Sequence, residues 1–414
     1  KLLKRCRSSQ IQKVEPVKYV FPVKHHEGQK RPVIVGMGPA GLFCGYVLAK
    51  AGFRPILLER GKCVEERSRD VEAFWKTGHL NTESNVQFGE GGAGTFSDGK
   101  LNTLIKDKYG RNKEVLRIFV KHGAPKEILY DYKPHIGTDI LKEIVRSMRE
   151  EILASGGDVR FETRVTDLLI ADGRIKGLVL NGQEELLAEH VVLALGHSAR
   201  DTFSMLLKRK IVMEPKPFAI GMRVEHPQEL INLSQYGKKE AGALGNAIYK
   251  LTAETSEKRG VYTFCMCPGG YIVNASSEPG RLAVNGMSNH ARDGRNANSA
   301  IVVTVDPSDF GGTDPLSGIA FQRKWEEAAY NTGQGKVPVQ LFADFCANRK
   351  STGIGAVIPS IRGQYALANV RETLPKFIGD SIEESFGYFD RRIHGFARED
   401  AILAGIESRT SSPV

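Results

Sequence analysis

The chain has 414 residues, of which 41% are hydrophobic and 26% are charged, a balance typical of a globular protein with two or more domains. No stretch approaches the ~18 apolar residues of a membrane-spanning helix, and no secretory signal opens the sequence. Seven units of the net charge of +10 lie in residues 1–31, so the rest of the chain shows no basic stripe of the kind that binds nucleic acid.

Residues 1–30 are interpreted as a basic linker or as the tail of a preceding domain. This arm could bind RNA or another anion, but we favour a solvated connector. We expect the sequence to be a fragment, because it does not begin with Met and stops after Ser411–Val414 without a closing element. Six cysteines without a secretory signal indicate reduced thiols in a cytoplasmic protein, or in a plastid protein if the source is a plant or alga. Their spacing predicts no metal site.

Residues 31–61 carry a dinucleotide-binding pattern. The apolar strand Val33–Val35 runs into three glycines spaced G-x-G-x-x-G, and a predicted helix and a second apolar strand follow. We expect Gly36 to permit a tight turn, Gly38 to let the backbone approach a pyrophosphate, and Gly41 to let the helix pack on the strand. This fingerprint alone fits any dinucleotide, with NAD as the default.

Two further parts of the same unit are expected to hold the nucleotide. Pro39 and Ala40 open the helix, whose free N–H groups and positive dipole end suit phosphates. Glu59 ends the second strand, 23 residues after Gly36, close to the ~20-residue spacing at which an acid accepts from ribose hydroxyls. Arg60 follows it and could reach phosphate or adenine.

The next notable stretch is the glycine-rich segment 86–101. A flexible linker is one interpretation. We favour a buried, ordered loop beside a ligand, because the aromatic residues Phe88 and Phe96 flank the glycines. Thr95 and Ser97 would supply hydroxyl donors, and Lys100 would supply a cation.

Residues 113–211 are predicted to finish the first domain. Helices are expected over 113–154, the clearest over 139–153 with Thr138 as its N-cap. A three-strand meander is expected from 159–161, 165–170 and 174–180, with an Asp-Gly turn at 172–173. The apolar strand 189–196 then returns to the parallel sheet and ends at Gly196, and a helix is expected to start at residues 196–198.

Residues 212–365 have a different character and are expected to form an inserted mixed domain that covers the active face. Strands are predicted at 218–224, 261–265, 281–284 and 301–305, with one amphipathic helix over 319–330. Residues 366–414 are predicted to be mainly helical, to end in a return strand at 406–413 and to rejoin the first domain. The domains expected are therefore 1–30, 31–211, 212–365 and 366–414.

Four longer motifs resemble one family, the bacterial and plastid flavoproteins called NAD(FAD)-utilizing dehydrogenases. They lie at residues 88–101, 267–275, 286–300 and 407–413. The resemblance implies a glutathione-reductase-type FAD-binding Rossmann domain with a β-meander and an inserted α+β substrate domain. It also implies bound FAD, and with it oxidoreductase activity, but no defined substrate. Members of the family continue into a further glycine-rich FAD motif after the segment matching 407–413, so we expect this chain to lack that motif.

The fingerprint alone leaves NAD as the default cofactor. Together with the glycine-rich loop, the meander and these motifs, it predicts FAD instead. The predicted cofactor contacts are Gly36, Gly38, Pro39, Ala40, Gly41, Glu59, Arg60, Gly91, Gly92, Thr95, Ser97, Gly99, Lys100, Leu101, Val165 and Gly196. The predicted catalytic residues are His197, His290, Arg292 and Lys100.

Each catalytic candidate has an alternative. His197 follows a strand end at the cofactor edge, where it would position FAD, relay a proton or cap the next helix. His290 and Arg292 would serve as a proton and anion pair for substrate, although their segment also has the composition of a turn. Lys100 would face the flavin ring or contact a phosphate. Cys265 and Cys267 share one face of a strand and could be thiols beside the flavin, but we favour buried core cysteines.

The expected function is that of an FAD-dependent oxidoreductase, with hydride passing between a small-molecule substrate or NAD(P)H and flavin N5. The alternative is a flavin-dependent RNA-modifying or RNA-binding protein that uses the basic arm. A non-catalytic FAD-binding protein is a third possibility. The sequence leaves the oligomeric state open.

Overall fold

A four-stranded parallel sheet forms the centre of the N-terminal half in the computed structural model, which describes residues 17–23, 25, 28–103, 105–238 and 244–414. Its strand order is β3-β2-β1-β7. The strands are β1 (Val33–Val35), β2 (Ile56–Leu58), β3 (Asp158–Arg160) and β7 (Val191–Leu193). Because side chains alternate along a strand, Ile34 and Leu57 face one side of the sheet, whereas Val33, Val35 and Leu58 face the other.

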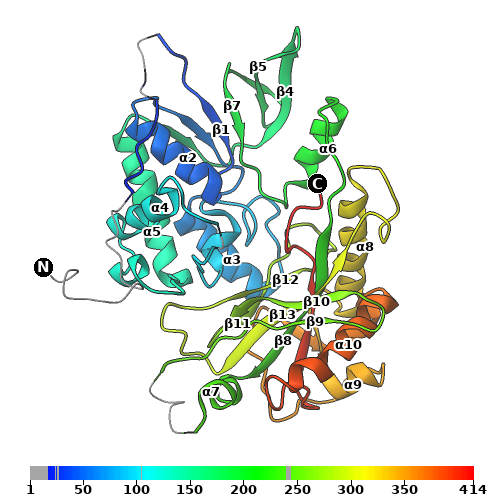
Figure 1. Cartoon of the computed structure of the whole chain (residues 1–414). Coiled ribbons are helices and arrows are strands. Elements are labelled where there is room, and N and C mark those ends of the chain that lie inside the picture. The colour runs from blue at the N-terminus through cyan, green and yellow to red at the C-terminus, as the bar shows by residue number, and fades with distance from the viewer. Residues whose placement is uncertain (1–16, 24, 26–27, 104, 239–243) are drawn as a thin grey trace, which may run out of the picture.

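Helices cover the Ile34 side of this sheet (Figure 1). Leu42, Phe119, Ile144 and Met148 are among the buried residues that pack there, on three different helices. The helical elements of this half before the meander are α2 (Pro39–Lys50), α3 (Val64–Thr77), η1 (Gly92–Phe96), α4 (Arg111–Lys121), η2 (Lys126–Leu129) and α5 (Thr138–Ala154).

An antiparallel meander and one helix cover the opposite side. Their elements are β4 (Val165–Ala171), β5 (Arg174–Leu180), β6 (Glu184–Leu187) and α6 (Arg200–Lys208). Leu168, Leu178 and Leu206 pack against Val33 and Leu58 of the parallel sheet. The two central strands β1 and β2 are thus buried on both faces, as their short, wholly apolar sequences require.

A seven-stranded sheet dominates the C-terminal half, in the order β16-β14-β17-β8-β13-β10-β9. All its pairings are antiparallel except that of β14 with β16. The strands are β8 (Phe218–Pro227), β9 (Thr252–Glu254), β10 (Gly260–Cys267), β13 (Asn296–Val305), β14 (Val337–Leu341), β16 (Tyr365–Leu367) and β17 (Ile402–Glu407). Strands β8 and β13 pair over ten residues in unbroken register and form its centre.

Apolar residues of this sheet and of its helices form the largest buried cluster of the described residues. The helical elements are α7 (Gln228–Tyr236), α8 (Ser317–Thr332), α9 (Phe342–Cys346), η3 (Val370–Thr373) and α10 (Lys376–Asp390). Phe342 stacks on Phe386 with ring centres 3.9 Å apart, which ties α9 to α10. Among the described residues, no helix has the length and apolar character needed to cross a membrane.

A small sheet joins the two halves, in the order β12-β11-β15. It comprises β11 (Tyr271–Asn274), β12 (Val284–Met287) and β15 (Ile361–Arg362). Val273 and Met287 of this sheet pack on Val71 of α3 and on Phe96 of the glycine-rich loop. The indole N–H of Trp75 in α3 also donates to the carbonyl of Asn274, at 3.0 Å.

The α/β fold class is confirmed, with its parallel sheet, meander and second mixed domain. The helix over 319–330 and the strands at 218–224, 261–265 and 301–305 are confirmed within larger elements. Residues 159–161 were expected in the meander but overlap β3, which pairs with β2 in the parallel sheet, and the third meander strand is β6.

Several boundaries also differ from expectation. The strand expected at 281–284 is β12, which begins at Val284. Thr138 is the first residue of α5, with Gly137 as its N-cap, and α6 starts at Arg200 rather than at residues 196–198.

The expected return of residues 366–414 to the first domain is the largest difference. Strand β17 pairs with β8 and β14 in the second sheet, and α10 packs in the same core. Only the segment after β17 approaches the first domain, as the contacts of Arg409 below show. The reason is that all six residues of β17 are buried. Such a strand is suited to the centre of a sheet, where both of its faces are covered, and not to an exposed edge.

Candidate functional site

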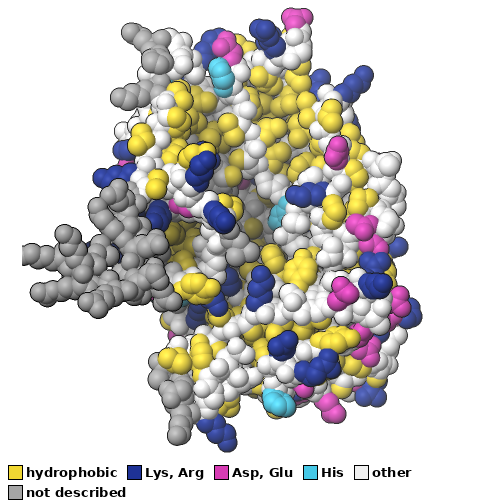
Figure 2. Space-filling view, in the orientation of Figure 1, with side chains coloured by type: hydrophobic (Ala, Val, Ile, Leu, Met, Phe, Trp, Pro, Cys, Tyr) yellow, Lys and Arg dark blue, Asp and Glu magenta, His cyan; other side chains and the backbone are white. Residues whose placement is uncertain are grey.

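One cavity of the first half, called the main cavity below because the predicted residues meet there, lies where the ends of β1, β2 and β7 meet the glycine-rich loop. It encloses about 370 Å³. Figure 2 shows the molecular face hollowed near its middle, between the two halves of the protein. The predicted residues that line the cavity are Gly36, Gly38, Pro39, Ala40, Glu59, Arg60, Gly92, Val165, Gly196 and His197.

Gly36 and Gly41 of the fingerprint play the structural roles expected of them, whereas the approach of Gly38 to a pyrophosphate stays a prediction. Gly36 has φ of +97°, and a Cβ atom there would lie 2.5 Å from the carbonyl oxygen of Ala194 in the strand-end segment after β7. A Cβ atom on Gly41 would lie 1.8 Å from the carbonyl oxygen of Gly36, so the helix can sit this close to the strand only without a side chain. Gly38 has open space beside it, with the nearest atom 3.9 Å away in Gly92.

Helix α2 presents an uncapped N-terminus to this cavity. Gly38 is the N-cap and Pro39 the first residue, with no side-chain cap hydrogen bond and no acidic residue in the first turn. The unbonded N–H groups of a helix start therefore remain available to an anion in the cavity.

The carboxylate of Glu59 joins three backbone segments: the fingerprint turn, the end of β2 and the glycine-rich loop. Its Oε2 accepts from the N–H of Met37 at 2.8 Å, and its Oε1 accepts from Gly61 at 2.9 Å and from Gly89 at 3.0 Å. These three bonds leave about one of the roughly four acceptor positions of a carboxylate free. Glu59 lines the cavity but is 4% exposed, and its three hydrogen bonds all order the surrounding backbone.

The glycine-rich loop is buried and ordered, as predicted. The N–H of Gly91 donates to the carbonyl of Met37 at 2.8 Å, and Gly92 packs so closely on Gly38 that an added Cβ would lie 2.9 Å from the Cα of Gly38. The hydroxyls of Thr95 and Ser97 donate to carbonyls of the loop itself, those of Glu90 and Gly94. They stabilise the loop rather than line the cavity.

Arg67 of α3, which was not among the residues predicted from the sequence, holds this loop in place through hydrogen bonds to its backbone. Its guanidinium is fully buried and donates to the carbonyls of Asn85, Val86, Gly89 and Glu90 at 2.6 to 3.3 Å. Burial lowers its pKa to about 10, which still leaves the side chain charged at neutral pH. A signal was present: Arg67 falls in line with the buried Val64, Val71 and Phe74 on the apolar face of its helix.

Arg60 closes the cavity on the β2 side. Its guanidinium lies 4.1 Å above the ring of Phe88 and is paired with Glu83 and Asp201, each at 2.9 Å. These two carboxylates fix the planar group at the rim, so its charge is largely compensated before any ligand binds.

His197 lines the same cavity as Arg60. Its Nε2 lies 2.7 Å from the carbonyl oxygen of Arg409, which can only accept, so Nε2 carries the hydrogen and Nδ1 remains an acceptor. Burial, together with the charges of Arg409 and Arg200, lowers the pKa of His197 to about 4. The imidazole is therefore neutral at pH 7, and it acts as a hydrogen-bonding group rather than as a base.

A buried ionic network lies behind His197 and connects the two halves. Glu326 of α8 pairs with Arg200 at 2.8 Å and with Arg409 at 3.1 Å, and Arg409 also reaches the hydroxyl of Ser198, which lines the cavity, at 3.2 Å. Burial raises the pKa of Glu326, but the charges of Arg409 and Arg200 outweigh this effect and hold the pKa well below its usual range. The wall of the cavity is thus anchored to the second domain.

The other three predicted catalytic residues lie outside the cavity lining. Arg292 pairs with Asp98, with Nε 2.9 Å from Oδ1, and Lys100 lies 3.1 Å from the same carboxylate. Burial raises the pKa of Asp98, but Lys100 and Arg292 outweigh it and bring the pKa to about 2. The ring of His290 stacks on His135 with centres 5.0 Å apart, and its Nδ1 contacts the carbonyl of Ile136.

Six predicted cofactor contacts besides Lys100 also lie outside the cavity lining. Gly91 and Gly99 face Val145 and Leu141 of α5, and the N–H of Leu101 donates to the carbonyl of Pro134. Gly41 faces Gly36 in the turn, as described above. Thr95 and Ser97 bond within the loop. The cofactor roles of all these residues stay predictions.

Comparisons with known proteins add a family to this geometry. Residues 217–410 match the family described as "FAD-dependent protein, C-terminal domain-like". A Clostridium beijerinckii protein described as uncharacterized is 51% identical over 419 aligned residues, covering 100% of this chain and 78% of its own length.

Solved structures match more weakly. THI4 of Thermovibrio ammonificans is 22% identical over 44% of this chain and 64% of its own, with a TM-score of 0.30. A mutant of the halogenase PltM in complex with FAD is 12% identical over 71% of this chain and 55% of its own, with a TM-score of 0.36. The match therefore spans less than two thirds of each of these solved chains.

Proposed function

We propose, on the premise that this chain belongs to the family of FAD-dependent proteins, that it is an oxidoreductase whose FAD binds in the main cavity. One observation carries the proposal: the fingerprint turn, Glu59, the glycine-rich loop and His197 all meet at that cavity. The finer expectation, a dehydrogenase that acts on a small molecule with NAD(P)H as electron donor, is part of the same proposal.

The residues present fit the cofactor. The uncapped start of α2 and the open space beside Gly38 suit a pyrophosphate, which needs N–H donors and a backbone without a side chain in the way. Arg60 and Arg164 also line the cavity, each already paired with Glu83, and the remaining acceptor position of Glu59 suits a ribose hydroxyl.

Bound FAD would supply the hydride chemistry, and the chain supplies binding, orientation and exclusion of water. His197 offers an acceptor at Nδ1 and is held in one tautomer by the Arg409 carbonyl. Its pKa of about 4 argues against a proton relay at neutral pH, so we assign it a positioning role. Ser198, held by Arg409, adds a hydroxyl on the same wall.

The test is the visible absorbance spectrum of the purified protein, before and after FAD is added and excess FAD is removed. We expect flavin bands that bleach when NAD(P)H is added without oxygen. Retention of flavin without bleaching by NADH or NADPH would keep FAD binding and overturn this choice of donor. A colourless protein that takes up no FAD would overturn the proposal.

The alternative of RNA recognition by the basic arm stays a prediction, because residues 1–16 lie outside the described residues. No contact of the described residues favours it over the flavin proposal.

A further inference from the structure

A pair of cysteines, Cys265 and Cys267, lies at the end of strand β10 in the second sheet. The pairing of β10 with β13 shifts between Phe264 and Cys267, and Cys265 within this irregularity has φ of +48°, an uncommon conformation for a residue with a side chain. The Cys267 sulfur lies 3.3 Å from the carbonyl oxygen of Cys265. Cys267 is fully buried, whereas Cys265 is partly exposed and hence open to a small reactant.

Two cations converge on this pair from different elements. The amine of Lys100, at the end of the glycine-rich loop, lies 3.9 Å from the Cys267 sulfur. The guanidinium of Arg223 in β8 is fully buried and donates to the Cys265 carbonyl at 3.3 Å and to Asn298 Oδ1 at 2.6 Å. Cationic surroundings of this kind stabilise a thiolate, which is the reactive form of cysteine.

The charges around the pair do not balance without a thiolate. Three cations face it or its neighbours, Lys100, Arg223 and Arg292, against the two carboxylates of Asp98 and Glu407. A third carboxyl, that of Glu225, interacts with Arg223, but burial raises its pKa to about 7, so it is only partly ionised at neutral pH. Because uncompensated buried charge is costly, a third anion would stabilise the cluster. Burial raises the pKa of Glu407, and any protonation of Glu407 would only enlarge the positive excess.

The neighbouring neutral groups are consistent with an anionic sulfur. The Nδ2 donor of Asn298 is buried without a hydrogen-bond partner among the described residues, and Asn298 pairs with Cys267 across the strands. Burial raises the pKa of Tyr249, which therefore stays uncharged. The hydrogen bond from Cys267, with the charges of Lys100 and Arg223, lowers the pKa of Cys265 well below its usual range, and the pKa of Cys267 is raised.

We propose that Cys265 is a thiolate nucleophile that undergoes thiol–disulfide exchange with disulfides of low-molecular-mass thiols, and that Cys267 is its resolving thiol. The Cys265 thiolate attacks one sulfur of the disulfide, forms a mixed disulfide and releases one thiolate. Cys267 then attacks the Cys265 sulfur of the mixed disulfide, and its proton passes to the second thiolate as that thiolate leaves. The protein pair is oxidised by two electrons and the small disulfide is reduced to two thiols. This activity is independent of the proposed flavin chemistry.

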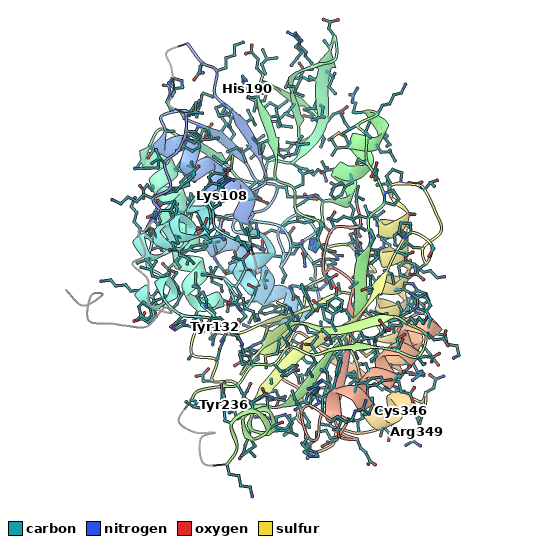
Figure 3. All side chains as sticks on the ribbon, viewed as in Figure 1. Lys108, Tyr132, His190, Tyr236, Cys346 and Arg349 are labelled. Carbon is teal, nitrogen blue, oxygen red and sulfur yellow. The ribbon has the colours of Figure 1, made fainter. Side chains whose placement is uncertain are left out.

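The first test is the pH dependence of iodoacetamide alkylation on the purified full chain, resolved by cysteine with peptide mass spectrometry. Cys346 is the internal control, since it is exposed and burial raises its pKa to about 11 (Figure 3). We expect the alkylation midpoint of Cys265 to lie at least about one pH unit below the ~8.5 of an ordinary thiol, and Lys100→Met to raise that midpoint by about one unit. Lys108→Met, at an exposed lysine, should leave it unchanged.

The second test uses oxidised glutathione as the disulfide. We expect the wild-type chain to lose two hydrogens from the peptide that contains both cysteines, and Cys267→Ser to retain one glutathione on Cys265. Cys265→Ser should take up none at Cys267.

An alkylation midpoint of Cys265 at or above that of an ordinary thiol would overturn the proposal, as would a glutathione adduct on Cys267 in Cys265→Ser. The flavin spectrum of the same samples reports separately on FAD binding, so loss of one activity does not decide the other.

Discussion

The Nε2 atom of His197, beside the end of β7, lies 2.7 Å from the main-chain oxygen of Arg409, just after β17. This bond joins the wall of the main cavity to the last strand of the second sheet, 212 residues further along the chain. Since Arg409 is in turn held by Glu326, the conformation of the cavity wall depends on contacts made in the other half of the molecule.

The bond can be tested by His197→Ala. On the proposed function, we expect this variant to bind FAD about tenfold more weakly, equivalent to ~1.4 kcal/mol, because one buried hydrogen bond and one wall of the cavity are lost. Titration of flavin fluorescence measures the dissociation constant. His190→Ala is the matched control, since His190 is exposed at the edge of the molecule (Figure 3). Equal affinities of the two variants would exclude the positioning role.

The Glu326 network predicts a large effect on stability. Glu326→Gln leaves the buried Arg200 and Arg409 without their shared carboxylate, which is expected to lower the free energy of unfolding by about 3–5 kcal/mol. Urea denaturation followed by circular dichroism gives this value. The neighbouring Glu327 is exposed, so Glu327→Gln should change stability by less than about 0.5 kcal/mol. Substitutions at neutral surface sites change the free energy of unfolding by roughly ±0.5 kcal/mol. A loss of under about 1 kcal/mol for Glu326→Gln would therefore show that the network does not stabilise the fold.

The fingerprint predicts opposite effects for two glycine substitutions inside helices. Gly41→Ala places a Cβ 1.8 Å from the Gly36 oxygen, so the turn must distort, and we expect loss of both stability and flavin retention. Gly387 in α10 has no atom within 4 Å of an added Cβ, and Gly387→Ala should stabilise the protein by about 0.5–1 kcal/mol. Thermal melting and the flavin-to-protein absorbance ratio distinguish the two. Normal flavin content in Gly41→Ala would contradict the close packing of turn and helix.

Glu225 predicts a pH dependence of stability. Burial raises its pKa from the ordinary value of 4.5 to about 7. Between these values the unfolded chain loses the proton while the folded chain keeps it, so rising pH favours unfolding, by about 3 kcal/mol over the whole window. Below and above the window both states carry the same charge and the dependence vanishes.

Glu225→Gln should remove this dependence. We expect its stability relative to wild type to rise by about 3 kcal/mol between pH ~4.5 and ~7.5, as measured by urea denaturation at several pH values. Glu229→Gln, at the exposed second residue of helix α7, is the control and should show no such trend. A constant difference between wild type and Glu225→Gln across this range would mean that the carboxyl ionises normally when folded.

The local part of the site could be read from the sequence because its signals are local. Gly36, Gly41 and Glu59 lie within one βαβ unit, and their spacing dictates a turn, a packed helix and an acidic strand end. The burial of the glycine-rich loop followed from the aromatic residues on both sides of it. Strand β8 and helix α8 were visible because their apolar patterns are long and regular.

The remainder depends on contacts between distant segments. Nothing in residues 158–160 distinguishes a meander strand from a strand that pairs with β2, because that choice depends on a partner a hundred residues earlier. The contacts of Arg409 with His197 and Glu326 are likewise visible only once β17 is placed in the second sheet. Lys100, predicted to face the flavin or to contact a phosphate, lies between Asp98 and Cys267, because its loop turns towards the second half after Phe96, and its role at a cofactor stays a prediction.

The position of β17 has a consequence for how the protein is made. A ribosome delivers β8 and β14 well before β17, which lies between them in the finished sheet. Until β17 emerges, the middle strand of the nascent domain carries an open edge of unpaired N–H and C=O groups, the kind of edge that recruits other chains. The second half therefore cannot complete its folding during most of its own translation, and its yield in a cell should depend on chaperones that shield this edge.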